Sequence, residues 1–119
     1  MTTPACMSPT SDFQRAAEAV LVRYPAAPAS ETETAIAVLA LWALGAVESG
    51  QLAPSDADRV FTMLDVRIDE AHGGPALSDA VTQLVLEGEH FHHWGDAWGP
   101  DRANLRGLAF SILAGAALP

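Results

Sequence analysis

A run of thirteen apolar or glycine residues, from Ala35 to Val47, most constrains how this chain of 119 residues can fold. A helix that crosses a membrane needs about twenty such residues, so the run is too short for that role. A surface helix carries one apolar stripe, whereas this run is apolar on every helical face. The sequence therefore predicts a central helix, from Glu31 to Ser49, that other helices or a second chain cover on every side.

Four further helical segments are indicated by apolar residues at spacings of three and four, and Pro, Gly and Ser separate them. No stretch alternates apolar and polar residues for long enough to predict a strand. The loops are short, which favours antiparallel neighbours. We therefore expect an all-α fold, a compact bundle of four or five mostly antiparallel helices. The expected helices cover residues 12–24, 31–49, 56–72, 79–94 and 101–118.

Several residues fit the ends of these helices. Ser30 with Glu33 fits the capping box, in which each side chain bonds the backbone N–H of the other residue. Gly50 fits the position after a helix where left-handed backbone is needed. Ser78 fits an N-cap, whose side chain accepts a hydrogen bond from the first turn. These signals predict where the second helix begins and ends and where the fourth begins.

The first ten residues are polar and contain two prolines, so we expect a disordered tail over 1–10 and one helical domain over 11–119. This tail has neither the basic residue nor the apolar run of a signal peptide. Cys6 is the single cysteine and forms no disulfide within the chain, which favours the cytoplasm. The absence of lysine beside many Ala and Arg residues indicates GC-rich coding, which is typical of bacteria.

Negative charge is concentrated in the second half of the chain. Fifteen Asp and Glu residues against six arginines give a formal net charge of −9. From Asp65 to Asp101 there are eight acids and one arginine, a net charge of −7. This balance excludes a direct nucleic-acid binder, which needs clustered positive charge. The acidic region is interpreted as a solvated surface, a docking surface for a basic protein, or a mimic of nucleic acid.

Three of the four histidines gather beside carboxylates in one short segment. On a helix, Glu89 lies one turn from His92 and from His93, so a carboxylate and an imidazole can share a face. Such ligands suit a divalent metal such as zinc, iron or manganese. Asp69 with His72 repeats the carboxylate–histidine spacing found in di-metal bundles. The candidate metal ligands are Asp69, His72, Glu89, His90, His92 and His93.

Two other interpretations of this histidine segment stay open. Three adjacent histidines cannot all bind one ion from a regular helix, whereas histidines in a last helical turn cap free carbonyl groups. Histidine also titrates near neutrality. Acidification would then make the segment less negative and weaken the binding of a basic partner.

A loop rich in tryptophan follows the histidines and contains Trp-Gly-Asp and then Trp-Gly-Pro-Asp. It is interpreted either as a hydrophobic clamp between the last two helices or as an aromatic anchor for a partner, because Trp is enriched at binding hot spots. Arg102 and Arg106 follow at once, and we expect them to pair with the nearby aspartates. The candidate ligand- or partner-binding residues are Trp94, Asp96, Trp98 and Asp101.

No motif of a known enzyme class is present. The glycines fit no nucleotide-binding fingerprint, no lysine is available for a Schiff base, and no serine sits in a nucleophile elbow. We therefore expect a protein that acts through protein–protein interaction, as a regulator, an inhibitor or immunity-type protein, or an accessory subunit. The apolar residues exceed what five short helices cover, which predicts a homodimer or a hetero-complex. The alternative is a metal-dependent or small-ligand-binding enzyme that uses residues 87–96.

Overall fold

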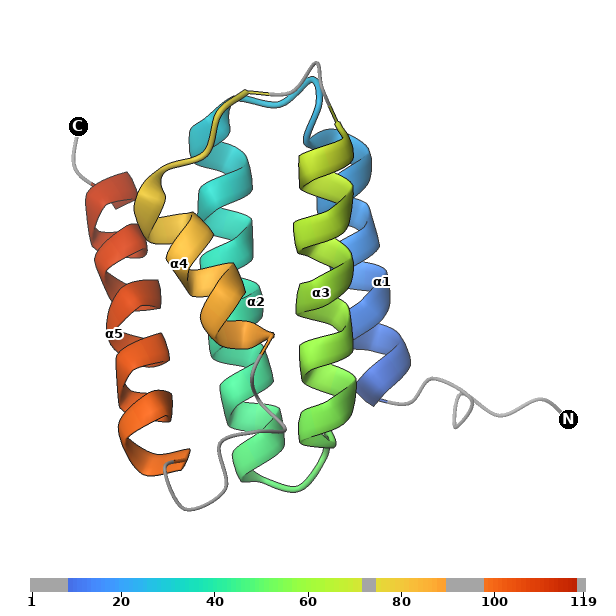
Figure 1. Ribbon diagram of the computed structural model, residues 1–119, viewed down its shortest axis with the longest axis vertical. Helices are drawn as coiled ribbons and strands as arrows, with labels where there is room; N and C mark the ends of the chain where they lie inside the picture. Colours follow the sequence, from blue (N-terminus) through green and yellow to red (C-terminus); the bar gives the residue numbers. More distant parts are fainter. Residues whose placement is uncertain (1–8, 72–74, 90–97, 118–119) are drawn as a thin grey trace, which may run out of the picture.

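The computed structural model describes residues 9–71, 75–89 and 98–117 of the chain (Figure 1). These residues form five helices and no strand, so the predicted all-α bundle is confirmed. Consecutive helices run in opposite directions from α1 to α3, as the short loops indicated. In chain order the helices are α1 (Pro9–Arg23), α2 (Ala29–Glu48), α3 (Pro54–Glu70), α4 (Asp79–Gly88) and α5 (Trp98–Ala117).

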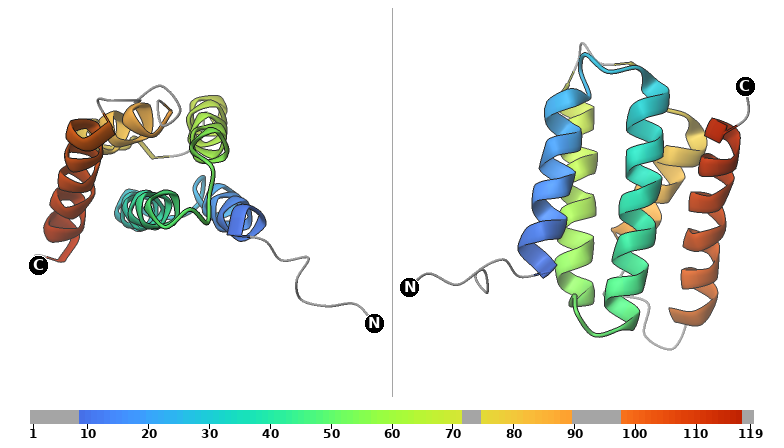
Figure 2. Two further views of the ribbon diagram at one scale, coloured as in Figure 1. Left: turned by 90° about the horizontal axis from the view of Figure 1, so that it is seen from below. Right: turned by 180° about the vertical axis from the view of Figure 1, so that it is seen from behind.

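The central helix is α2, as its apolar run predicts. It packs against all four of the other helices, which surround it on three sides when the bundle is seen from below (Figure 2, left). Ile36, Ala40 and Leu44 are fully buried at these contacts. Among the described helices α2 alone is long and apolar enough to cross a membrane, a criterion that the core helix of a soluble bundle also meets. The four helices leave the fourth side of α2 uncovered, and its cover by a second chain, the other expectation, stays a prediction.

Aromatic rings from three helices meet in the core. Phe13 of α1 and Phe61 of α3 are fully buried, and their ring centroids lie 6.0 Å apart. Trp42 of α2 meets the Phe13 ring edge-on, with centroids 5.7 Å apart. Edge-to-face pairs of this kind add about 0.5–1.5 kcal/mol to the burial of the rings. These contacts join α1, α2 and α3 into the larger part of the core.

Two of the predicted helix ends are confirmed. Gly50 has a φ of +78°, a left-handed conformation that glycine adopts without steric cost. The N–H of Gly50 donates to the carbonyl of Val47, and that of Gln51 donates to the carbonyl of Ala46, as in a Schellman motif. Ser78 is the N-cap of α4, and its hydroxyl accepts from the N–H of Val81 at 3.4 Å.

The predicted capping box at the start of α2 is wrong. The helix begins at Ala29 with Pro28 as its N-cap, and no side chain caps it. Ser30 therefore already lies inside the first turn. The Glu33 carboxylate instead accepts a hydrogen bond of 2.6 Å from the N–H of Ser78, which ties the start of α2 to the start of α4.

The last two helices also differ from their predicted form. Helix α4 ends at Gly88, with Glu89 as its C-cap, rather than at Trp94. Helix α5 begins at Trp98 rather than at Asp101. It carries no charged residue after Arg106, yet it lies at the edge of the bundle (Figure 1), and its Phe110 is exposed. Among the described helices, α2 and α4 make most of the contacts with it.

Gly88 allows α3 and α4 to approach closely. A Cβ atom at this position would contact the Cγ atom of Phe61 and lie 2.6 Å from its Cδ1 and Cδ2 atoms. The ring is fully buried and has no free space into which it could move.

We expect Gly88→Ala to lower the free energy of unfolding by about 1–2 kcal/mol, because the added methyl group overpacks the Phe61 ring. The matched control is Gly107→Ala in α5, where a Cβ atom meets nothing within 4 Å. This control should stabilise the protein by about 0.5–1 kcal/mol through helix propensity. Urea denaturation of both variants measures the two changes, and equal changes would contradict the close α3–α4 contact.

Candidate functional site

Most of the predicted site residues fall outside the described part of the chain. Trp98 is the first residue of α5 and Asp101 lies in its first turns, but their side chains are not described. Asp69 and Glu89 are described. The candidate residues outside the described ranges are His72, His90, His92, His93, Trp94 and Asp96.

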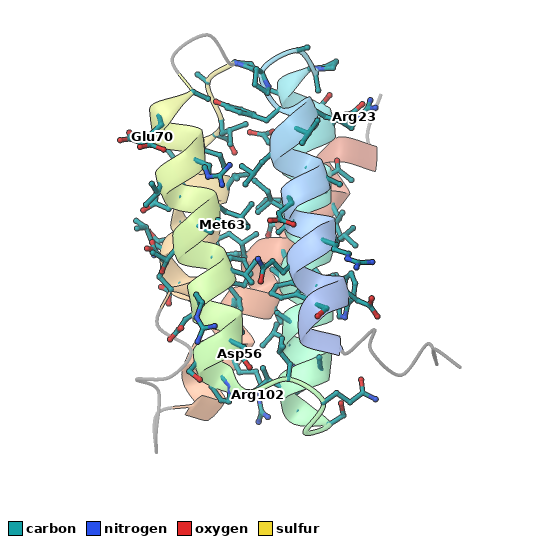
Figure 3. The ribbon with its side chains drawn as sticks, turned by 90° about the vertical axis from the view of Figure 1, so that its right-hand side faces the viewer. Arg23, Asp56, Met63, Glu70 and Arg102 are labelled. Atoms are coloured by element: carbon teal, nitrogen blue, oxygen red, sulfur yellow. The ribbon has the colours of Figure 1, made fainter. Side chains whose placement is uncertain are left out.

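Asp69 and Glu89 lie at different levels of the bundle. Glu89 follows Gly88, which packs on Phe61 near the middle of α3. Asp69 is eight residues further along α3, about 12 Å at the helical rise of 1.5 Å per residue. Its neighbour Glu70 lies at the end of the bundle that also holds Arg23 (Figure 3). The two carboxylates are therefore not brought together.

The described residues are the part of the predicted metal site that the structure bears on. Among the described residues, no group of three or more His, Cys, Asp or Glu side chains lies close enough to hold a metal ion. Glu87, from the predicted Glu-x-x-His spacing, accepts hydrogen bonds from Gln83 at 3.0 Å and from Asn104 of α5 at 3.3 Å. The metal-site hypothesis now depends on four histidines outside the described ranges and stays a prediction.

Arginines anchor both ends of α2 to its neighbours. Arg23 of α1 donates two hydrogen bonds to Glu31, at 2.7 and 3.0 Å. At the other end of α2, Arg102 and Arg106 of α5 each reach a different oxygen of Glu48 at 2.9 Å. Both arginines were expected to pair with nearby aspartates. Glu48 was not predicted as their partner, because it lies more than fifty residues away in sequence.

The uncovered side of α2 lies between α1 and α5, which flank it on opposite sides (Figure 2, right). Val38 is 50% exposed and Trp42 is 39% exposed. Phe110 is 55% exposed and follows Arg106 by one helical turn, so it lies on the flank of α5 that contacts Glu48. We call the surface formed by Val38, Trp42 and Phe110 the apolar face.

The acidic residues gather on the other helices. Helices α3 and α4, with Glu89, carry eight carboxylates and two arginines, a formal charge of −6. Helices α1, α2 and α5 carry six carboxylates and four arginines, a formal charge of −2. We call the surface of α3 and α4 the acidic face. The bundle therefore has an acidic face and an apolar face on different helices.

The sequence analysis did not identify the residues of the apolar face. Val38 and Trp42 lie within a run that is apolar all round, so the run does not show which side stays open. A finer signal is the spacing of Glu31, Ala35, Val38, Trp42, Gly45 and Ser49, which alternates four and three residues along one side of α2. The structure shows that this side is the uncovered one, since all six residues are exposed or half-buried.

Comparisons with protein-family models, with curated proteins and with solved structures found no match to this chain. No residue role can therefore be carried over from a relative.

The Arg23–Glu31 pair gives stability a dependence on pH. The hydrogen bonds from Arg23 lower the pKa of the Glu31 carboxyl below its ordinary value of 4.5. A lowered pKa means that the pair stabilises the fold above the unfolded pKa and that this contribution is lost as pH falls through the folded value. We expect Glu31→Gln to lower the urea midpoint at pH 7, and we expect its difference from wild type to shrink as pH falls below 4.5. A difference that stays the same at every pH would contradict this assignment.

Glu48 should contribute more to the free energy of unfolding than an ordinary surface charge does, because its one carboxylate holds the guanidinium groups of Arg102 and Arg106 of α5. We expect Glu48→Ala to lower the free energy of unfolding by about 1 kcal/mol. Glu18→Ala, at an exposed position of α1, is the matched control and should change it by less than about 0.5 kcal/mol. Thermal denaturation of both variants tests this, and equal shifts would argue against the anchoring of α5 by Glu48.

Proposed function

We propose that this protein acts by binding another protein chain through the apolar face. The observation that carries the proposal is the exposure of Val38 and Trp42 on the uncovered side of the central helix, together with that of Phe110 on the flanking helix α5. Val22, Val66 and Leu86 are also exposed, but they lie on α1, α3 and α4, one on each helix. Single exposed apolar residues are common, whereas a gathered patch marks an interaction site.

The apolar face has the properties of a binding hot spot. Trp42 supplies a large ring at little entropic cost, because its contact with buried Phe13 already holds it in place. The backbone beneath the face belongs to helices whose other sides form the core, so binding requires no refolding. Truncating such an anchor commonly costs 2 kcal/mol or more of binding free energy, by order of magnitude about 30-fold in affinity.

The acidic face supports the same role in a different way. Its formal charge of −6 attracts basic surfaces and so raises the rate of encounter with a basic partner. Its exposed large apolar side chains are Val66 of α3 and Leu86 of α4, and neither is aromatic. We therefore assign docking to the apolar face and steering to the acidic face.

Affinity capture tests the proposal with tagged wild-type chain and two variants. Val38→Glu places a charge in the apolar face, and Val66→Glu places one at a position of similar exposure, 48%, on α3. We expect any chain that binds wild type to bind Val66→Glu equally well and to bind Val38→Glu at least about tenfold more weakly. Equal capture by all three baits would overturn the proposal. Circular dichroism and urea denaturation check that both variants fold.

A further inference from the structure

We infer that the chain on the apolar face is a second copy of this protein, with its α2 packed antiparallel against the first. This inference rests on the proposed function and names the partner. Four features of the molecule support it. They are the spacing along α2, the match of large with smaller side chains when two copies of α2 run antiparallel, the distribution of charge and the size of the face.

The spacing along the uncovered side of α2 is that of a coiled-coil seam. Six positions alternate at four and three residues, and side chains with this spacing interlock with those of a second helix. Glu31 and Ser49 form the polar ends of the seam, and apolar or small residues form its centre. The central positions are Ala35, Val38, Trp42 and Gly45.

Only one antiparallel register pairs all six positions of the seam with those of a second copy. In this register Val38 lies opposite Trp42 of the partner subunit, and Ala35 lies opposite the partner's Gly45. The large ring thus meets a medium side chain, and the two small residues let the helix backbones approach. A Cβ atom at Gly45 would meet nothing within 4 Å in the single chain, so the space above it is open. The sequence of the seam is therefore complementary to itself when reversed.

The distribution of charge favours a second copy on this face. Each chain carries a formal charge of −9, so two copies repel each other over most of their surface. The helices of the apolar face carry −2, and Arg23, Arg102 and Arg106 hold carboxylates of α2 in ion pairs. Packing these helices together leaves the acidic faces, with −6 each, on the two outer sides of the dimer.

The size of the face fits a stable dimer. A helix of 20 residues, as α2 and α5 are, is about 30 Å long. Neighbouring helix axes lie about 8–10 Å apart, so α1, α2 and α5 together present about 600 Å² in projection. Specific interfaces bury about 800 Å² on each partner, so the face is of the same order as such an interface.

Sedimentation equilibrium of the full chain tests the dimer. We expect wild type and Val66→Glu to be dimers at about 100 µM, and we expect Val38→Glu to dissociate at least about tenfold more readily, because its carboxylate would be buried against the partner's Trp42. A monomeric wild type at this concentration overturns the inference, and so does a Val38→Glu dimer as tight as wild type.

Disulfide cross-linking tests the orientation, with Cys6→Ser as the background of every variant. In the antiparallel register Ala35→Cys of one copy lies opposite Gly45→Cys of the other, so a mixture of the two variants should cross-link. Each variant alone should not, because equal positions lie about 15 Å apart along the helix axis, beyond the roughly 7 Å between Cα atoms that a disulfide spans. Cross-linking of each variant alone would indicate a parallel pair and overturn the antiparallel arrangement.

The two proposals fail in distinguishable ways. If wild type is a monomer and captures a different protein that Val38→Glu does not bind, the second copy is excluded while the proposed function stands. If neither a second copy nor any other chain distinguishes wild type from Val38→Glu, both proposals are overturned.

Discussion

The burial of α2 against four neighbouring helices is the constraint on which the rest of the structure depends. Ile36, Ala40 and Leu44 of α2 are fully buried at these contacts. The other helices are stabilised by packing against this buried surface of α2. Because α2 is apolar on every side and its neighbours cover only three sides, the fold itself creates an exposed apolar surface. The same helix thus stabilises the bundle with its buried side and leaves Val38 and Trp42 exposed on its other side.

The charged residues are distributed so that the exposed apolar surface has little net charge around it. The carboxylates at the two ends of α2 are engaged by arginines from α1 and α5, so the helices around the apolar face carry little net charge. The excess of acids over arginines lies mostly on α3 and α4, where it repels other negatively charged surfaces. The net charge of the chain is therefore a poor description of any one of its surfaces.

Sequence patterns predicted the helical fold and the central position of α2, because apolar spacing and Pro, Gly and Ser breaks are local properties of the chain. Ser78 as the N-cap of α4 and Gly50 after the end of α2 were predicted correctly for the same reason. Glu33 was misassigned because its acceptor role depends on Ser78, which is distant in sequence. The exposure of Phe110 was not predicted, because composition shows that a helix is apolar and not which neighbours reach it.

The hydrogen bond from Ser78 to Glu33 has a consequence for the order in which the chain folds. Helix α4 has ten residues, fewer than an isolated helix needs to be stable in water. Its first turn relies on a carboxylate 45 residues earlier, and its last residue rests on the ring of Phe61. The chain has to close these loops before α4 gains its stabilising contacts, so we expect α4 to form on a scaffold of α1, α2 and α3 rather than before it.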